Sequence, residues 1–510
     1  IYKEIGPGVR IALSKLAVQK FEQTGRPLRL AIDTSIWLFQ IQSAKGGTNP
    51  ALRTFYYRLL RLMSLAIHPL FVFDGPNKPP FKRHKRTGPN VASIPEFLAK
   101  QLLKQFGFPF HLAPGEAEAE CALLQREGIV DAVLSEDVDT LMFGSGVTIR
   151  NWTPEGSKAK TPTHVNLYEA DKTKAGRSGL DREGMVLVAL MSGGDYIPEG
   201  VPGCGPKTAC EAARAGFGKD LCELSRKDAS TLRTWRERLQ YELQTNESKF
   251  FRTKHSALSI PEDFPNPDVL GYYTHPVVSS KEKIERLRQS LSWDLDIDFP
   301  ALREFTSDAF AWTKLGGAKH FIRNLSPALL TRELLIRGQG PDARNDDFAV
   351  TENEEAHLVH SIHGTREHAS TDNTTELRIA FVPHKIVPID LSLEEPDDEL
   401  PEDEAEADDL GAALIEDIDA PDIPGSPTKR RAPTKYDPMG LEKTWVLETY
   451  ARVGVPLKVQ DWEESLRNPK KALAARRTNK VATKGKAKTS KTAGMQRGAL
   501  DKFAKTMKPG

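Results

Sequence analysis

The sequence predicts an α/β fold in which helices flank a mostly parallel central sheet, followed by a helical portion and a small C-terminal β-rich module. Three observations lead to this prediction. Short apolar, β-branched runs alternate with helical patterns in the first part of the chain. The apolar period then becomes helical, and strand-like runs return after about residue 375. A chain of 510 residues has room for about three domains of this kind.

The elements of the first part can be assigned in chain order. Strands are expected at residues 28–33, 70–74, 132–135 and 147–150. Residues 51–66 have apolar side chains at helical spacing, with Arg53, Arg58 and Arg61 outside the apolar stripe, which is typical of a crossover helix. Helical periods from 183 to about 215 and from 281 to 337 predict an all-α portion after the sheet.

The C-terminal part differs in composition. A polar stretch at about 345–375 indicates a linker, residues 376–383 and 443–450 indicate strands, and residues 461–467 indicate a short helix. An acidic insertion spans residues 394–422, and residues 470–510 carry thirteen Lys or Arg against one Asp. Such blocks repel themselves and resist packing. The basic tail suits nucleic-acid contact or import, although a merely solubilising tail has the same composition.

Composition excludes several classes of protein. The apolar runs are far shorter than the ~20 residues that a membrane span needs, and no secretory leader is expected. Four cysteines, Cys121, Cys204, Cys210 and Cys222, form no CxxC pair and lack clustered histidines. We therefore expect reduced thiols, with neither a zinc site nor a disulfide framework. The formal net charge of +1 says nothing about partners.

Carboxylates end several of the predicted core elements. Asp33 and Asp74 end two strands, and ligands gather at the carboxyl edge of parallel sheets. Each also has an ordinary explanation, since Asp33 could cap the next helix and Asp74 could begin a Gly-Pro turn. Glu116 and Glu118 lie in the first turns of a helix, where the macrodipole alone favours acids. Residues two apart on a helix diverge by ~200°, so the two are not expected to reach one ion equally.

Three further acids complete the set. Asp137 and Asp139 follow a buried strand, and Asp195 follows an apolar helix beside two glycines. Seven clustered carboxylates would repel one another unless cations neutralised them. Oxygen ligands select Mg²⁺ or Mn²⁺. Two such ions ~3.5–4 Å apart can hold an attacking water and the departing 3′ oxygen of a phosphodiester.

In this order, the runs at 31–35, 72–76, 113–119 and 135–140 resemble the two nuclease motifs of the XPG-like superfamily of structure-selective nucleases. The resemblance covers roughly residues 1–340. It implies that Asp33, Asp74, Glu116, Glu118, Asp137, Asp139 and Asp195 form a catalytic, metal-binding set for two Mg²⁺ or Mn²⁺ ions.

Residues 195–209 resemble the helix-two-turn-helix of this superfamily. By that resemblance Gly203 and Gly205 let the backbone approach a DNA phosphate and hold a monovalent cation, and Lys207 adds a contact at the next helix N-terminus. A plain glycine-rich turn between core helices is the alternative.

Residues 196–203 are most similar to the Gen/Yen branch, the Holliday junction resolvases. The basic patch Lys82, Arg83, Lys85 and Arg86 resembles the family's arch base, where cations contact the scissile strand; a solvated charge run is the alternative. The arch is short, which suits a substrate without a free 5′ end to thread.

Residues 375–468 resemble a chromodomain, with Phe381, Trp445, Tyr450 and Trp462 as its expected aromatic core. Whether it binds DNA or a histone peptide stays open. The resemblance divides the chain into an N-terminal nuclease region at 1–86, a short arch at 87–110, an internal nuclease region at 111–190, a helical DNA-binding region at 191–340, a linker at 341–374, the module at 375–468 and a basic tail at 469–510.

The expected activity is an endonuclease that cuts four-way junctions with paired, near-symmetric incisions and leaves 5′-phosphate and 3′-hydroxyl ends. By resemblance it is a monomer when free and a homodimer on branched DNA, and it has no membrane role. A 5′-flap endonuclease or exonuclease and a non-catalytic DNA-binding scaffold are the rivals. Ser426 lies in a proline-directed kinase pattern beside the basic residues 429–431, which predicts nuclear localisation with regulated import.

Overall fold

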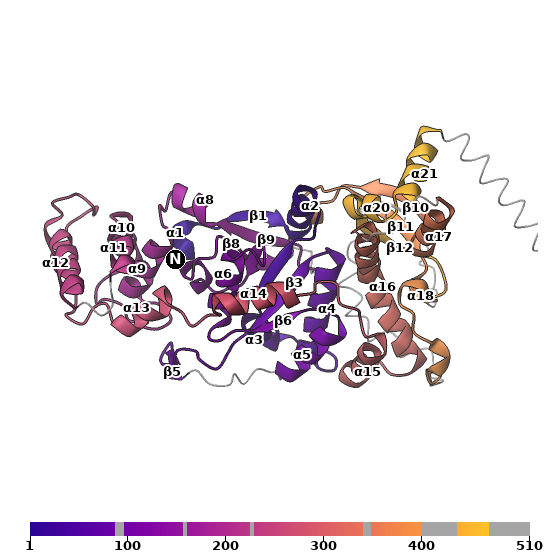
Figure 1. The fold of residues 1–510 in the computed structure, drawn as a ribbon, viewed down its shortest axis with the longest axis horizontal. Helices are drawn as coiled ribbons and strands as arrows, with labels where there is room; N and C mark the ends of the chain where they lie inside the picture. The colour runs from indigo at the N-terminus through magenta and orange to yellow at the C-terminus, as the bar shows by residue number, and fades with distance from the viewer. Residues whose placement is uncertain (87–95, 157–160, 225–228, 340–347, 399–435, 469–510) are drawn as a thin grey trace, which may run out of the picture.

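The computed structural model describes residues 1–510 except 87–95, 157–160, 225–228, 340–347, 399–435 and 469–510. The described chain is elongated (Figure 1). Helices α9 to α13 form one end, a central sheet with its helices forms the middle, and the C-terminal module with α16 forms the other end. No helix among the described residues combines the length and apolar character needed to cross a membrane.

The central sheet has seven strands in the order β1-β9-β8-β7-β2-β3-β6. Neighbours from β6 to β8 run parallel, and β9 and β1 are antiparallel additions at one edge. The mostly parallel sheet expected from the sequence is confirmed. The strands are β1 (Val9–Ala12), β2 (Arg29–Asp33), β3 (His68–Phe73), β6 (Phe110–Leu112), β7 (Ala132–Leu134), β8 (Val147–Thr153) and β9 (His164–Glu169).

Helices cover both faces of this sheet, because its strands bury alternate side chains on opposite sides. Leu30 and Ile32 of β2 pack in the main core with α2 to α5, whereas Ala31 packs with α6 and α14 on the other face. The helices of this part are α1 (Tyr2–Ile5), α2 (Leu13–Thr24), α3 (Thr34–Gln40), α4 (Pro50–Ser64), α5 (Glu96–Gln105), α6 (Ala117–Arg126), α7 (Asp139–Met142) and α8 (Ala170–Ala175). The expected crossover helix is α4.

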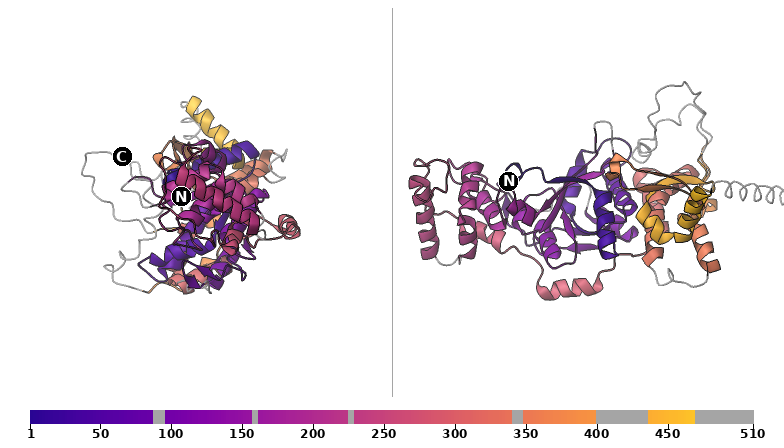
Figure 2. Two further views of the ribbon diagram at one scale, coloured as in Figure 1. Left: turned by 90° about the vertical axis from the view of Figure 1, so that its left-hand side faces the viewer. Right: turned by 90° about the horizontal axis from the view of Figure 1, so that it is seen from above.

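The helical portion packs around a second core, which also includes residues of α6, α7 and β9. It contains α9 (Arg182–Ser192), α10 (Pro206–Arg214), α11 (Phe217–Glu223), α12 (Ala229–Thr245) and α13 (Pro267–Thr274). The chain then returns along the outside of the sheet through α14 (Lys281–Ser290), as Figure 2 shows, to α15 (Phe299–Phe310) and α16 (Lys314–Gln339). A two-stranded hairpin, β4 (Phe81–Lys82) and β5 (Lys85–Arg86), stands apart from the sheet.

The C-terminal module is a three-stranded antiparallel sheet in the order β10-β11-β12 with helices around it. Its elements are α17 (Phe348–Leu358), β10 (Ser361–Arg366), β11 (Glu376–Phe381), α18 (Pro383–Ile386), β12 (Glu442–Leu447), α20 (Glu448–Gly454) and α21 (Pro456–Arg467). Phe381 and Tyr450 are fully buried, Trp462 packs against the core, and Trp445 lies beneath Arg366. The predicted small β-rich module is confirmed.

The structure differs in three details from what the sequence predicts. The interval read as a linker contains α17 and β10, because polar side chains occupy the solvent-facing positions of real elements. The last strand ends at Leu447, three residues before the predicted end, and α20 begins at Glu448. The module is also not separate, since Leu377, Phe381 and Tyr450 belong to the same apolar core as Leu30 and Phe71 of the central sheet.

The cysteines and the acidic insertion also have defined positions. All four cysteines are free, as expected. The first residues of the insertion are attached to the protein rather than loose: Glu394 receives two hydrogen bonds from Arg303 at 2.8 and 2.7 Å, and Asp397 accepts from the backbone of Gly316. Residues 399–422 of the insertion and the basic tail lie outside the described residues.

Candidate metal centre

The predicted carboxylates come together at the carboxyl edge of the parallel strands. Asp33 ends β2, Asp74 follows β3, and Asp137 follows β7. Glu116 stands just before α6, in the connection that follows β6. Because these strands run parallel, the sequence positions that follow them meet at one side of the sheet.

Asp33 is 3% exposed and is held from two sides. Its carboxylate accepts a hydrogen bond from the backbone of Ile36 at 3.3 Å, so it does cap α3, and another from the Ser135 hydroxyl at 3.2 Å. The Ser135 hydroxyl also accepts from the Asp137 backbone at 3.1 Å. The capping and functional explanations of Asp33 are therefore compatible, and Ser135 links two acids from different strands.

Asp74 contacts the start of the next acidic segment. Its Oδ1 accepts from the backbone N–H of Ala117 at 2.9 Å, and its Oδ2 lies 3.1 Å from the Lys78 ammonium. Ala113 and Pro114 pass so close to Gly75 that a Cβ there would meet their backbone oxygens. The Asp-Gly-Pro run is a turn that also fixes a carboxylate against α6.

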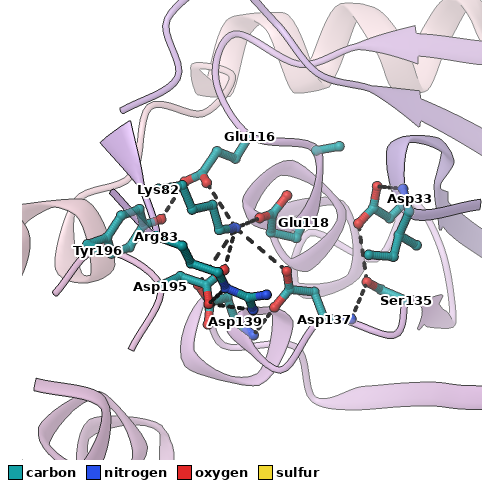
Figure 3. A network of polar contacts seen from close by, with 12 residues as sticks. Asp33, Lys82, Arg83, Glu116, Glu118, Ser135, Asp137, Asp139, Asp195 and Tyr196 are labelled. Atoms are coloured by element: carbon teal, nitrogen blue, oxygen red, sulfur yellow. Dashed lines mark hydrogen bonds and ion pairs between the residues drawn. The ribbon is translucent and has the colours of Figure 1, made fainter. Parts of the chain in front are cut away.

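Lys82 of the β4–β5 hairpin occupies the middle of the acidic cluster (Figure 3). Its ammonium is paired with five carboxylates, at 2.7 Å from Glu118, 3.3 Å from Asp195, 3.4 Å from Glu116, 3.6 Å from Asp137 and 3.9 Å from Asp139. The acids come from three separate segments, so one cation joins a large part of the acidic edge to the hairpin.

Two further side chains complete the network. Arg83 donates from Nε to Asp195 Oδ1 at 2.8 Å, and its NH2 lies 2.7 Å from the same oxygen. The Tyr196 hydroxyl donates to Glu116 at 2.6 Å. Neither Tyr196 nor Ser135 was assigned from the sequence, although each directly adjoins an assigned run: Tyr196 follows Asp195, and Ser135 opens the run that contains Asp137 and Asp139.

The premise that Glu116 and Glu118 both lie within the helix is wrong. Glu116 precedes the helix at its N-cap position with extended backbone angles, φ −77° and ψ 137°, and only Glu118 lies within α6. The ~200° separation applies to two residues that are both helical. Both carboxylates therefore reach the same ammonium, at 3.4 and 2.7 Å.

Burial and mutual repulsion make protonation favourable in the absence of a metal ion. Burial, with Asp74 and Asp137, raises the pKa of Asp33 to about 7. Burial also raises the pKa of Glu118 and of Asp139 well above the usual carboxyl value. Burial alone would lower the pKa of Lys82, but Glu118 and the other acids outweigh it and raise that pKa. A buried edge with more anions than cations favours binding of further positive charge.

The residues fit a hard divalent cation. Asp137, Asp139 and Asp195 each offer an oxygen, and these oxygens lie within 4.8 Å of one another. Asp139 is 1% exposed, and its Oδ2 is buried without a hydrogen-bond donor. The whole donor set is carboxylate oxygen, with no sulfur or imidazole, which is the chemistry that Mg²⁺ and Mn²⁺ prefer.

The residues predicted to contact DNA are distributed over two places. Lys82 lies within the acidic cluster, whereas Arg83 contacts the cluster through Asp195 and keeps an exposed side chain. Lys85 and Arg86 form β5, where Arg86 pairs with Phe81; their side chains lie outside the described part of the chain, as does Ser426.

The other three predicted DNA contacts lie at the helical end, in the turn between α9 and α10. Gly203 has φ +80°, and Gly205 caps α10. No neighbouring atom lies within 4 Å of a Cβ built at either glycine, and Lys207 is exposed. The turn is therefore open to a ligand from outside.

Family comparisons match three regions of the chain. The XPG N-terminal domain matches residues 7–88, and the XPG I-region matches residues 107–195. The C-terminal domain of the Holliday junction resolvase Gen1 matches residues 358–465. The first two regions contain all seven carboxylates, and the third contains most of the C-terminal module.

Solved structures are similar over nearly the whole chain. A eukaryotic junction-resolving enzyme, GEN-1, with caesium is 51% identical, covers 92% of this chain and 99% of its own, and superposes with a TM-score of 0.77. The Holliday junction-resolving enzyme GEN1 in complex with product DNA and Mg²⁺ is 50% identical, covers 91% and 98%, and has a TM-score of 0.73.

A longer mammalian relative is similar over part of the chain. The mouse protein named flap endonuclease GEN homolog 1 is 32% identical over 217 residues, which are 38% of this chain. The match spans only 23% of the mouse protein's length.

Proposed function

The chain belongs to the Gen-type branch of the XPG-like nucleases, and from this membership we propose that it is a Mg²⁺-dependent endodeoxyribonuclease that resolves four-way DNA junctions. One observation carries the proposal: seven carboxylates from separate segments converge at one edge of the sheet, where they need cations to be stable. The similarity at 51% identity supports the same activity, because it includes the C-terminal module as well as the nuclease core.

Asp137, Asp139 and Asp195 would hold one ion, with Asp33, Asp74, Glu116 and Glu118 available for a second. A pair of bound Mg²⁺ ions would supply Lewis acidity, lowering the pKa of a water nucleophile and offsetting charge on the phosphodiester oxygens. Cleavage of the bond to the 3′ oxygen leaves 5′-phosphate and 3′-hydroxyl ends. The structure of a similar enzyme in complex with product DNA and Mg²⁺ supports this choice of ion.

The chain's own side chains position these acids. Ser135 donates to Asp33, Tyr196 donates to Glu116, and the Ala117 backbone donates to Asp74. Each bond fixes a carboxylate rotamer before substrate arrives, which removes an ordering cost from the reaction. Lys82 and Arg83 supply positive charge where a scissile phosphate would approach the acidic edge.

The protein would also bind DNA outside the acidic edge. We assign Gly203, Gly205 and Lys207 to a duplex phosphate, because the turn is open and precedes a helix N-terminus. Lys82, Arg83, Lys85 and Arg86 would contact the scissile strand from the hairpin. We also place a monovalent cation at the glycine turn, as the family resemblance implies, and similar enzymes bind sodium, potassium and caesium.

Further parts of the proposal concern assembly and regulation. Two copies on one junction would allow the second cut before the junction dissociates, and the free protein would be a monomer. The chain would act in the nucleus in recombination and repair, and phosphate on Ser426 would cancel charge at the adjacent basic cluster and reduce import.

The function is tested with immobile four-way junctions and 5′ flaps of matched sequence, each with Mg²⁺ and with a chelator. We expect Mg²⁺-dependent, paired incisions at symmetric positions on opposing strands of the junction. Strong flap cutting with only unpaired nicks in junctions would instead establish the flap endonuclease, an activity that the mouse relative's name favours. Junction binding without any cleavage would establish the scaffold, which gains nothing from acids beside DNA phosphates.

A further inference from the structure

A pocket of about 270 Å³ opens beside the acidic edge and includes none of the assigned residues. Trp37, Gln40, Arg58 and Trp152 line one part of it, and the loop residues Ser135 and Glu136 line another. Ser135 is the residue whose hydroxyl lies 3.2 Å from Asp33, so the pocket and the acidic edge share a wall. In Figure 3, Ser135 lies on the opposite side of the network from Arg83 and Tyr196.

The cation in this pocket is Arg58. Its guanidinium carbon lies 5.1 Å from the centre of the Trp37 ring, and Trp37 in turn stacks on Trp152 at 5.8 Å with 25° between the rings. Arg58 donates one hydrogen bond, from NH1 to the side-chain oxygen of Gln40 at 3.3 Å. Within the described part of the chain, no carboxylate lies within ion-pairing distance of it.

This is an incompletely paired, half-buried cation. Burial lowers the pKa of Arg58 to about 10, which still leaves it charged at neutral pH. Removing an unpaired charge from water is unfavourable, and a cation–π contact offsets only part of that cost. A guanidinium has five N–H donors, and most of those on Arg58 stay available.

The other polar groups of the pocket suit an anion as well. The Trp152 ring N–H is buried without a hydrogen-bond acceptor. Glu136, the acid in the wall, is already bound to the Asn151 backbone at 2.6 Å and to Arg150 at 3.3 Å. The donors that remain therefore outnumber the free acceptors, and a planar guanidinium fork matches two oxygens of a phosphate.

We propose that this pocket receives a backbone phosphate of bound DNA, held by Arg58, on the side of the acidic edge opposite to Lys82 and Arg83. This inference rests on the proposed DNA substrate. Cations on both sides of the acids would hold a strand across an edge that by itself repels phosphates. The tryptophans would keep the Arg58 head in place, so its contribution is to position the strand.

The test measures binding to a four-way junction without divalent ions, so it does not depend on cleavage. Each phosphate contact contributes about 0.9 to the slope of log K against log salt concentration for duplex DNA. Arg58→Met should reduce that slope by about one contact and weaken binding roughly ten-fold at low salt, whereas Arg58→Lys should keep the slope. Arg286→Met is the matched control, because Arg286 is exposed on α14 at the other face of the sheet.

A second measurement uses the wild-type protein in case Arg58→Met unfolds. Junction DNA should change the emission of the stacked Trp37–Trp152 pair, and Trp152→Phe should remove that part of the change. An unchanged salt slope in a folded Arg58→Met protein would overturn the proposal. It would equally be overturned if millimolar inorganic phosphate alone produced the full emission change and DNA did not compete, which would mark a free-phosphate site. Absence of junction cleavage by the wild-type protein with Mg²⁺, together with the expected slope change in Arg58→Met, would instead count against the proposed function alone.

Discussion

The ammonium nitrogen of Lys82 lies 2.7 Å from Oε1 of Glu118, closer than to any other of the five acids around it. A cation of the protein itself thus lies at the centre of the acidic edge. Lys82 lies on a hairpin that forms a two-stranded sheet of its own, separate from the central sheet. The pairing makes Lys82 both a stabiliser of the metal-free protein and a competitor of metal ions.

Lys82→Met should therefore strengthen metal binding in the absence of DNA. At ~4 Å and an effective dielectric constant near 20, one charge contributes about 4 kcal/mol, of which solvent and relaxation remove much. We expect Mn²⁺ to bind at least ~10-fold more tightly to Lys82→Met in calorimetry. Without metal, the variant should also unfold at a lower temperature than wild type. Added Mn²⁺ should remove this difference in unfolding temperature.

Lys100→Met is the control for this experiment, because Lys100 pairs with Glu96 on α5 outside the acidic edge. Its metal affinity should match that of wild type. Unchanged or weaker Mn²⁺ binding by folded Lys82→Met would show that the ammonium does not compete with the metal.

Neutral replacements of two acids should separate cleavage from binding. Glu118→Gln and Asp139→Asn keep shape but remove one negative charge each from a site where both residues are buried. Cleavage should fall by at least ~10³-fold, the size of a lost electrostatic contribution in an active site. Junction affinity without metal should stay equal or rise, because fewer anions repel the phosphates.

Glu127→Gln, at the other end of α6, is the matched control and should cut at the wild-type rate. Gel-shift and single-turnover assays on the same junction give both quantities. Undiminished cutting by Asp139→Asn would remove Asp139 from the metal set.

The metal-free protein should lose stability as pH rises between about 4 and 7. Burial and the neighbouring acids raise the pKa of Asp33 to about 7 in the folded chain, against ~3.9 in an unfolded chain. Between these values the folded state binds more protons than the unfolded state, so the free energy of unfolding falls with rising pH. The contribution of Asp33 should be about 2 kcal/mol between pH 5 and 7, at ~1.4 kcal/mol per pKa unit.

Urea unfolding in the presence of a chelator at several pH values measures the slope of the free energy of unfolding against pH. Asp33→Asn should flatten it, because the amide does not titrate, and saturating Mg²⁺ should flatten it in wild type, because a metal ion then replaces the proton. Identical slopes in wild type and Asp33→Asn would mean that Asp33 titrates normally in the folded chain.

The sequence predicts features that depend on neighbouring residues, and it does not predict those that depend on contacts between residues far apart in the chain. The parallel strands and the acids at their ends are visible because both are local patterns, a β-branched run followed by Asp. The pairing of Lys82 with the acids cannot be predicted from the sequence, because the acids lie 34 to 113 residues away. The β4–β5 hairpin is what brings the Lys82 ammonium to them. Glu116 was misjudged for a local reason, since helix boundaries are uncertain by a few residues and one residue decides whether it is helical.

The attachment of the C-terminal module is hidden from the sequence for the same long-range reason as the position of Lys82. Its strands were found from their composition, but its attachment was not, because core contacts between Phe21 and Tyr450 join residues more than four hundred positions apart. The pocket at Arg58 was equally hidden: the sequence shows only an arginine outside an apolar stripe, which is the usual sign of a solvated position.

The shared core predicts that the C-terminal module and the nuclease sheet unfold together. Tyr450 is fully buried, its ring meets Phe21 of α2 edge-on at 5.5 Å, and its hydroxyl donates to the Leu65 carbonyl at 3.2 Å. Asp372 of the module also accepts from the Ala12 backbone at 2.7 Å, at the edge strand β1. Tyr450→Ala should cost about 3–5 kcal/mol, as large-to-small core changes do, and Tyr450→Phe about 1 kcal/mol, for one hydrogen bond. Calorimetry should show one transition that moves as a whole in both variants. Two transitions, of which only the smaller moved, would show instead that the module is an independent unit and that its contacts with α2 contribute little to stability.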